Sequence, residues 1–130
     1  MAVLISYKVL LDRFPNILEP SGSNVRAKED FLELVRLMLA LVEVNDQWYR
    51  EKYPDVSDAV DAGEYRSTRQ HFIDHGYFEW RLPGRLTIDE AWYVNEYEDV
   101  QIGIENGEIA SAEEHFNLHG YAEGRLPVKL

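Results

Sequence analysis

Cysteine is absent from this chain of 130 residues. The absence excludes disulfide bonds and thiolate chemistry and is compatible with a reducing compartment, so we expect a cytoplasmic protein. A signal peptide is not expected either. Ala2–Ser6 is too short for an apolar core, no basic residue precedes it, and Lys8 interrupts the apolar residues after it.

Long hydrophobic runs are also missing. The longest apolar stretch, around Leu37–Val42, is far shorter than the roughly 20 residues that a membrane-spanning helix needs. We therefore expect no insertion into a membrane.

Basic residues are scarce in the last third of the chain. Residues 1–45 carry a net charge of −1, residues 46–86 of −2 and residues 87–130 of −8, and no Lys or Arg occurs between Thr87 and Gly124. Such a surface repels phosphate backbones and anionic lipids, so nucleic acid is not an expected partner. The acidic surface either attracts a basic protein partner or keeps a small domain soluble, and the sequence leaves both interpretations open.

Motifs of catalysis and cofactor binding are missing as well. The chain has no Gly-x-Ser-x-Gly sequence, no phosphate-binding glycine loop and no cysteine nucleophile. Carboxylates are plentiful, but a general acid/base pair needs burial and mutual placement that spacing alone cannot show. We therefore expect a protein that is not an enzyme and that binds no cofactor.

What the chain does contain is an internal duplication. Residues Asp46–Leu86 align without a gap with residues Glu90–Leu130, at a constant offset of 44. A fixed period of this length is typical of repeat architectures. The matched residues include Trp48-Tyr49 with Trp92-Tyr93, Tyr53 with Tyr97, Asp55-Val56 with Asp99-Val100, Gly63-Glu64 with Gly107-Glu108, Ser67 with Ser111, His71-Phe72 with His115-Phe116, His75-Gly76-Tyr77 with His119-Gly120-Tyr121, and Arg81-Leu82-Pro83 with Arg125-Leu126-Pro127.

The predicted fold is all-α. Residues 46–86 (the first segment) and residues 87–130 (the second segment) are expected to be tandem copies of a repeat with three short helices and a tail. Residues 1–45 are expected to form an N-terminal helical hairpin. Apolar spacing predicts a first helix that ends at Pro15, Glu19–Asn24 has the composition of a loop, and a second helix is expected over Val25–Val44.

Capping residues define the expected helix ends in the two segments. Side-chain oxygens that can accept from free backbone N–H groups mark the N-caps, Asp55 and Asp99 for the second helix and Ser67 and Ser111 for the third. Glycines favour the left-handed C-cap conformation, and they are expected to end these helices at Gly63, Gly107, Gly76 and Gly120. An extended or turn-like tail is expected over Tyr77–Pro83 and Tyr121–Pro127.

The expected helix at Val25–Val44 is apolar on all sides from Leu37 to Val42, so it needs cover on all sides. One interpretation is a homodimer formed through this helix. The other is that the two segments clasp it as a central core helix. Self-association would use Phe31, Leu34, Leu37, Met38 and Leu41.

The repeated pattern Trp-Tyr…Tyr-Pro-Asp-Val…Gly…Ser…His-Phe…His-Gly-Tyr…Glu…Arg-Leu-Pro resembles a short helical repeat of bacterial proteins. That repeat occurs beside glycosyltransferase domains of surface-polysaccharide systems and in some large secreted proteins. The match covers residues 46–130; the first segment departs from it at Trp80, where the second has Gly124, and the second departs at Glu98, where the first has Pro54. The resemblance implies an accessory module in a polysaccharide context, with a glycosyltransferase or a polysaccharide as partner, and it implies no catalytic residues.

All four histidines lie in one repeated motif, as the pairs His71 and His75, and His115 and His119. The i, i+4 spacing places two imidazoles on one helix face, as in helical zinc sites, and copper or nickel also accepts imidazole. Further oxygen ligands could come from Asp74, Glu79 or Glu114. The alternative is structural, because a histidine in a capped helix can hydrogen-bond a neighbouring carbonyl or the aspartate of the preceding turn.

Two more repeated features have a functional and a structural interpretation. Arg81 and Arg125 either present a charged pair with the glutamate two residues before them to a ligand, or hold the tail onto Asp55 or Asp99 or onto carbonyls at a helix end. Exposed faces of Trp48 and Trp92 could stack on sugar rings, whereas buried faces would form the core of each segment.

These observations favour a non-catalytic protein-interaction or scaffolding module. Its expected partner is a protein, with a second copy of the chain as one candidate. The alternative is a metal- or small-ligand-binding protein that uses the four histidines.

Overall fold

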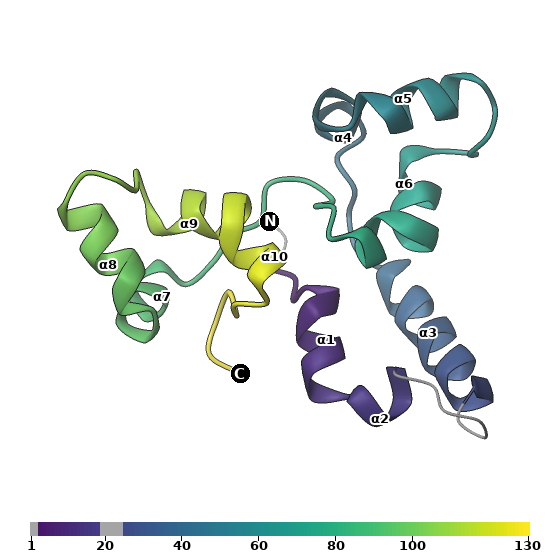
Figure 1. Ribbon diagram of the computed structural model, residues 1–130. Coiled ribbons are helices and arrows are strands. Elements are labelled where there is room, and N and C mark those ends of the chain that lie inside the picture. The colour runs from purple at the N-terminus through teal and green to yellow at the C-terminus, as the bar shows by residue number, and fades with distance from the viewer. Residues whose placement is uncertain (1–2, 19–24) are drawn as a thin grey trace. The chain divides into compact units, whose positions relative to one another are not determined.

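The computed structural model describes residues 3–18 and 25–130, so the predicted loop Glu19–Asn24 lies outside the described residues. The described residues form helices and no strand, which confirms the all-α prediction (Figure 1). Two compact units are present. One is Leu10–Gly84, and the other combines Arg85–Leu130 with the N-terminal stretch up to Val9.

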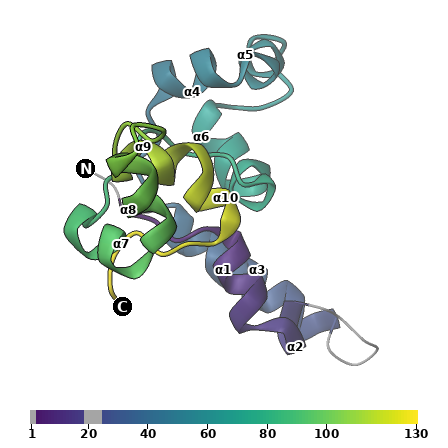
Figure 2. The same cartoon turned by 60° about the vertical axis from the view of Figure 1, so that its left-hand side comes forward.

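Three helices precede the first segment, namely α1 (Tyr7–Arg13), α2 (Pro15–Leu18) and α3 (Val25–Leu39). Pro15 ends the first helix as predicted and also begins the next one, because proline is tolerated at the first helical position, where no N–H bond is lost. With 15 residues, α3 is the longest helix in the described part of the chain (Figures 1 and 2).

Helix α3 is shorter than the predicted Val25–Val44. After Leu39 the backbone tightens, since the amides of Leu41 and Val42 donate to carbonyls three residues back rather than four. The guanidinium of Arg69 donates to the carbonyls of Ala40 and Val42. These carbonyls are therefore satisfied by a side chain, and the helix is not continued.

The first segment contains α4 (Asp46–Lys52), α5 (Pro54–Asp61) and α6 (Thr68–His71), followed by a π-helical turn η2 (Phe72–Gly76) and a 3₁₀ turn η3 (Tyr77–Glu79). The second segment contains α7 (Glu90–Glu96), α8 (Glu98–Glu105) and α9 (Ala112–His115), followed by a π-helical turn η4 (Phe116–Gly120) and α10 (Tyr121–Glu123). The first helix of each segment is capped by a side chain that the sequence analysis missed: Asn45 accepts from the amide of Trp48, and Asp89 from that of Trp92, both at 3.0 Å.

The prediction that Asp55 and Asp99 are N-caps is wrong. Helices α5 and α8 begin two residues earlier than predicted, and their N-cap residues are Tyr53 and Tyr97. Pro54 in α5 favours this earlier start, because its fixed φ suits the first helical position. The two aspartates lie in the first turn instead, where arginine side chains bind them.

The predicted ends at Gly63 and Gly107 are confirmed. Both glycines have a positive φ, 79° and 76°. Around Gly63 the amide of Glu64 donates to the carbonyl of Ala59, and the amide of Gly63 donates to that of Val60, which is the hydrogen-bond pattern of a Schellman motif. The same two bonds surround Gly107.

The third helix begins as predicted but does not end as predicted. Ser67 and Ser111 accept from the amides three residues on, at 3.0 and 3.1 Å. Gly76 and Gly120 are not C-caps, because both keep right-handed helical angles and the helix continues for three more residues. It ends at Trp80 (φ 61°) and Gly124 (φ 79°), so the residues just before them are helical and not an extended tail.

The glycines at 76 and 120 have a steric reason instead. A Cβ on Gly76 would collide with the hydroxyl of Tyr49, and a Cβ on Gly120 with the hydroxyl of Tyr93. The backbone of the π-helical turn therefore lies directly against a buried tyrosine of the first helix. Only glycine permits this approach.

The cores of the two segments contain the same residue types at matching positions. Large aromatic side chains dominate, as expected for short helices that must bury enough apolar area to be stable. Side chains at matching positions that are at most 2% exposed include Tyr49, Val56, Phe72 and Tyr77 in the first segment, and Tyr93, Val100, Phe116 and Tyr121 in the second.

Candidate functional site

One histidine of each predicted metal pair belongs to the core. His71 and His115 are only 4% and 9% exposed, and their Nδ1 atoms lie 3.0 and 3.1 Å from the hydroxyls of Tyr49 and Tyr93. Burial lowers the pKa of both imidazoles, because a charged ring is poorly solvated there. Burial likewise raises the pKa of both tyrosine hydroxyls. Each neutral pair therefore joins the first helix of its segment to the third.

The other histidine of each pair is exposed. The ring of His75 lies 5.8 Å from that of His71, and the ring of His119 lies 5.7 Å from that of His115, measured between centroids. Across residues 3–18 and 25–130, no three His, Asp or Glu side chains are grouped so that they could hold a metal ion. Metal binding by the four histidines stays a prediction, and this geometry does not favour it.

Two of the three carboxylates suggested as additional ligands have other partners. Asp74 accepts from the amide of Gln70 at 2.6 Å, and Glu79 is paired with Arg81 at 2.9 Å. Glu114 lines a hollow together with the two histidines of its segment.

The structural interpretation of the two arginines is confirmed. Arg81 donates two hydrogen bonds to Asp55, at 3.0 and 2.8 Å, and Arg125 donates two to Asp99, at 2.8 and 2.7 Å. These bonds lower the pKa of both aspartates. Each guanidinium also lies 4.9 Å from the ring centroid of a tyrosine, Tyr53 or Tyr97.

Trp48 and Trp92 are half-buried. Their rings make edge contacts with Tyr53 and Tyr97, at centroid distances of 6.2 and 6.1 Å. The residue after each tryptophan, a tyrosine, is the fully buried core residue. The tryptophans therefore cover the core from its edge, which matches the structural interpretation in part.

The predicted self-association residues fall into two groups. Leu34, Leu37, Met38 and Leu41 are 54%, 63%, 64% and 88% exposed. Phe31 is half-buried, and its ring packs on that of Phe14 at a centroid distance of 5.5 Å. We call these four exposed side chains, three on α3 and Leu41 in the turn after it, the α3 apolar stripe.

The opposite side of α3 is buried through Val35 and Leu39. Helix α3 therefore carries large apolar side chains on an exposed side as well as on its buried side. An apolar stripe of this kind on a helix surface is typical of a protein-binding face.

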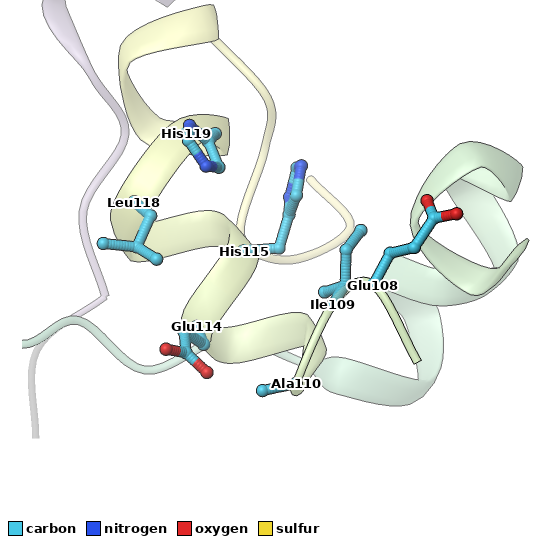
Figure 3. A pocket seen from close by; sticks show the side chains of 7 residues that line it. All are labelled: Glu108, Ile109, Ala110, Glu114, His115, Leu118 and His119. Carbon is cyan, nitrogen blue, oxygen red and sulfur yellow. The ribbon is translucent and has the colours of Figure 1, made fainter. Parts of the chain in front are cut away.

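The second segment also contains a hollow that the sequence analysis missed. It has a volume of about 190 Å³ and is lined by seven residues, namely Glu108, Ile109, Ala110, Glu114, His115, Leu118 and His119 (Figure 3). In the view of Figure 3, His115 lies between His119 and Ile109. A sequence signal did exist, because position 109 is isoleucine where the first segment has Tyr65.

No helix in the described ranges combines the length and the hydrophobicity required to cross a membrane. Comparisons with protein-family models, curated proteins and solved structures found no match to this chain. A functional proposal for this protein therefore depends on the geometry of the described residues.

Proposed function

We propose that this protein is a non-catalytic interaction module built from two tandem copies of one three-helix unit, and that it self-associates through the α3 apolar stripe. The tandem arrangement is supported by the matching bonds of the two segments, above all the tyrosine–histidine and arginine–aspartate pairs. The single observation that carries the interaction is the exposure of four large apolar side chains on α3 and in the turn that follows it.

The spacing of the α3 apolar stripe fits a helix partner. Leu34, Leu37 and Met38 have the i, i+3, i+4 spacing that places side chains on one side of a helix, and Leu41 follows in the turn after α3 ends at Leu39. Exposing such side chains costs free energy, at about 25 cal/mol for each Å² of apolar surface left in water. Covering them with a second apolar stripe removes that penalty.

A second copy of the chain is the occupant that the charges favour. Helix α3 carries three basic and three acidic residues, so two α3 helices can approach without net repulsion although the whole chain has a net charge of −11. Two such stripes related by a two-fold axis would cover each other, because a two-fold symmetric interface uses the same surface on both copies.

The expected dimer is reversible. A stable interface buries about 800 Å² on each partner, and four side chains supply only part of that area. We therefore expect a monomer–dimer equilibrium that shifts with protein concentration rather than a permanent dimer.

Sedimentation velocity over a concentration series tests this proposal. The double variant Leu37→Asp with Leu41→Asp should sediment as a monomer at concentrations where the unchanged protein forms a dimer. Both positions are exposed, so the variant should keep its helical circular dichroism. The matched control is Ile102→Asp, an apolar side chain 48% exposed on α8, which should leave the dimer intact. A folded monomer at every concentration before substitution would contradict the proposal.

The resemblance of residues 46–130 to repeats beside polysaccharide glycosyltransferases supports a role in bacterial surface-polysaccharide assembly. In that role the module would scaffold a glycosyltransferase and would not itself transfer sugar. This part of the proposal depends on the resemblance, and the dimer does not.

A further inference from the structure

A tyrosine ring covers the histidine pair of the first segment. The ring of Tyr65 meets that of His71 at a centroid distance of 4.8 Å and an angle of 84°, and that of His75 at 5.7 Å and 67°. Both are edge contacts, the arrangement that aromatic rings prefer. One phenol thus lies against both imidazoles.

The second segment lacks this cover. The residue equivalent to Tyr65 is Ile109, whose side chain packs against Gly103 of α8 so closely that a Cβ there would collide with it. The first segment has Ala59 at the position of Gly103. Replacing alanine by glycine thus makes room for Ile109 on α8, and the imidazoles of His115 and His119 line an open hollow instead (Figure 3).

We propose that this hollow binds an aromatic side chain from a basic segment of a partner protein. The incoming ring takes the place that Tyr65 occupies in the first segment. The first segment thereby shows which kind of side chain fits against the histidine pair. This interface is separate from the α3 apolar stripe and does not depend on it.

The size and lining of the hollow suit a ring. Its volume is about 190 Å³, and an apolar cavity of about 150 Å³ is large enough to bind benzene. Ile109, Ala110 and Leu118 supply apolar surface, and the two imidazoles supply ring edges and faces. Leu118 is 56% exposed, so part of this surface has no cover within the described chain.

The charges around the hollow select a basic partner. Glu108 and Glu114 line it, and residues 87–130 have ten acids and two bases. The equivalent of Glu114 in the first segment is Gln70, and the equivalent of Ala110 is Arg66. The second segment therefore attracts lysine or arginine next to the ring, whereas the first does not.

Three short peptides test the chemistry by NMR titration of the histidine ring resonances. The probe is acetyl-Lys-Lys-Tyr-Lys-Lys-amide; the ring control replaces tyrosine with alanine, and the charge control replaces the four lysines with glutamates. We expect the probe to shift the resonances of His115 and His119 with a dissociation constant of about 1 mM, as expected for one anchoring side chain. Each control should bind about tenfold more weakly, and the probe should bind more weakly as salt is added.

Reciprocal substitutions test the location. Ile109→Tyr should supply the missing ring from within the chain and abolish the response of His115 and His119. The double variant Ala59→Gly with Tyr65→Ile, which reproduces Gly103 and Ile109, should uncover the first segment. The tyrosine of the probe should then reach His71 and His75, but without the added attraction of the acidic residues. Leu118→Arg is a second variant that should block the hollow. Because Leu118 is exposed, this variant should fold and can replace Ile109→Tyr if that protein does not fold.

Three outcomes would overturn the proposal. They are the absence of any shift, equal binding of the probe and the ring control, and unchanged binding after Ile109→Tyr or Leu118→Arg. None of them bears on self-association, which is measured without peptide, so failure of this site and failure of the dimer are distinguishable.

Discussion

The two segments share their interior and differ at their edges. In each, a buried tyrosine meets a buried histidine, an arginine binds an aspartate, and a serine caps the third helix. What differs is charge, −2 against −8 in residues 46–86 and 87–130, and the cover of the histidine pair. The comparison separates residues that a unit needs to fold from residues that are available for binding.

In both segments a side chain donates a hydrogen bond to the carbonyl just before the first helix, but the two donors lie at different positions. The equivalent carbonyls of Val42 and Leu86, just before each segment's first helix, both accept from a side chain of the third helix. Arg69 donates to the first at 3.0 Å, and Asn117 donates to the second at 2.8 Å. Arg69 and Asn117 are not at equivalent positions, so aligning the two copies cannot reveal this shared role.

The largest expected effect tests the shared interior. Gly76→Ala and Gly120→Ala should each lower the free energy of unfolding by about 2–4 kcal/mol, because the new methyl group meets a buried tyrosine hydroxyl that cannot move away. The two losses should be similar. Urea denaturation followed by circular dichroism measures both.

Removing the hydroxyl provides the control. In the double variant Gly76→Ala with Tyr49→Phe, the nearest remaining atoms lie 3.4 Å from the new Cβ, an ordinary contact. The double variant should therefore be more stable than Gly76→Ala alone. If Tyr49→Phe instead added its own loss to that of Gly76→Ala, the steric explanation would be wrong.

The next largest effect is the pH dependence of the free energy of unfolding. Since burial lowers the pKa of His71 and His115, the unfolded chain binds more protons than the folded one below the ordinary histidine pKa of about 6.5. Stability should be fully present above this pH and fall as the pH drops below it, by at most about 1.4 kcal/mol per pH unit for each extra proton. Asp55 and Asp99 add a further loss only below their ordinary pKa of about 3.8, since arginine lowers theirs.

Denaturation between pH 5 and pH 8 measures this dependence. His71→Asn and His115→Asn should each reduce the slope below pH 6.5 while lowering stability at pH 8. A protein that becomes more stable on acidification to pH 5, or a slope that neither variant changes, would count against the buried neutral imidazoles.

The smallest expected effect concerns the end of the third helix. Trp80 has a φ of 61°, which strains a residue with a side chain, whereas Gly124 has a φ of 79° without strain. Trp80→Gly should raise the free energy of unfolding by about 0.5–1 kcal/mol, and Gly124→Ala should lower it by a similar amount. Thermal unfolding measures both. A loss of stability in Trp80→Gly would show that contacts of the half-exposed indole outweigh the backbone strain.

The sequence predicted what depends on local chemistry. Helical class, the serine caps and the ends at Gly63 and Gly107 follow from residue type and spacing. The arginine–aspartate pairs join residues 26 apart in the sequence and were only one of the alternatives that the sequence left open. The role of Gly76 and Gly120 could not be predicted. In a sequence, a glycine that makes room for a distant tyrosine cannot be distinguished from one that ends a helix. The hollow at Ile109 depends likewise on a contact with Gly103, which spacing alone does not show.

The central claim is that the protein dimerises through α3. Disulfide trapping tests this claim most directly, because the chain has no cysteine of its own. Single cysteines are introduced at Leu37, on the α3 apolar stripe, and at Ile102, an exposed control site. Under mild oxidation the Leu37→Cys protein should form a covalent dimer much faster than the Ile102→Cys protein, and added Leu41→Asp should slow it to the control rate. Equal rates for the two single variants would contradict the account.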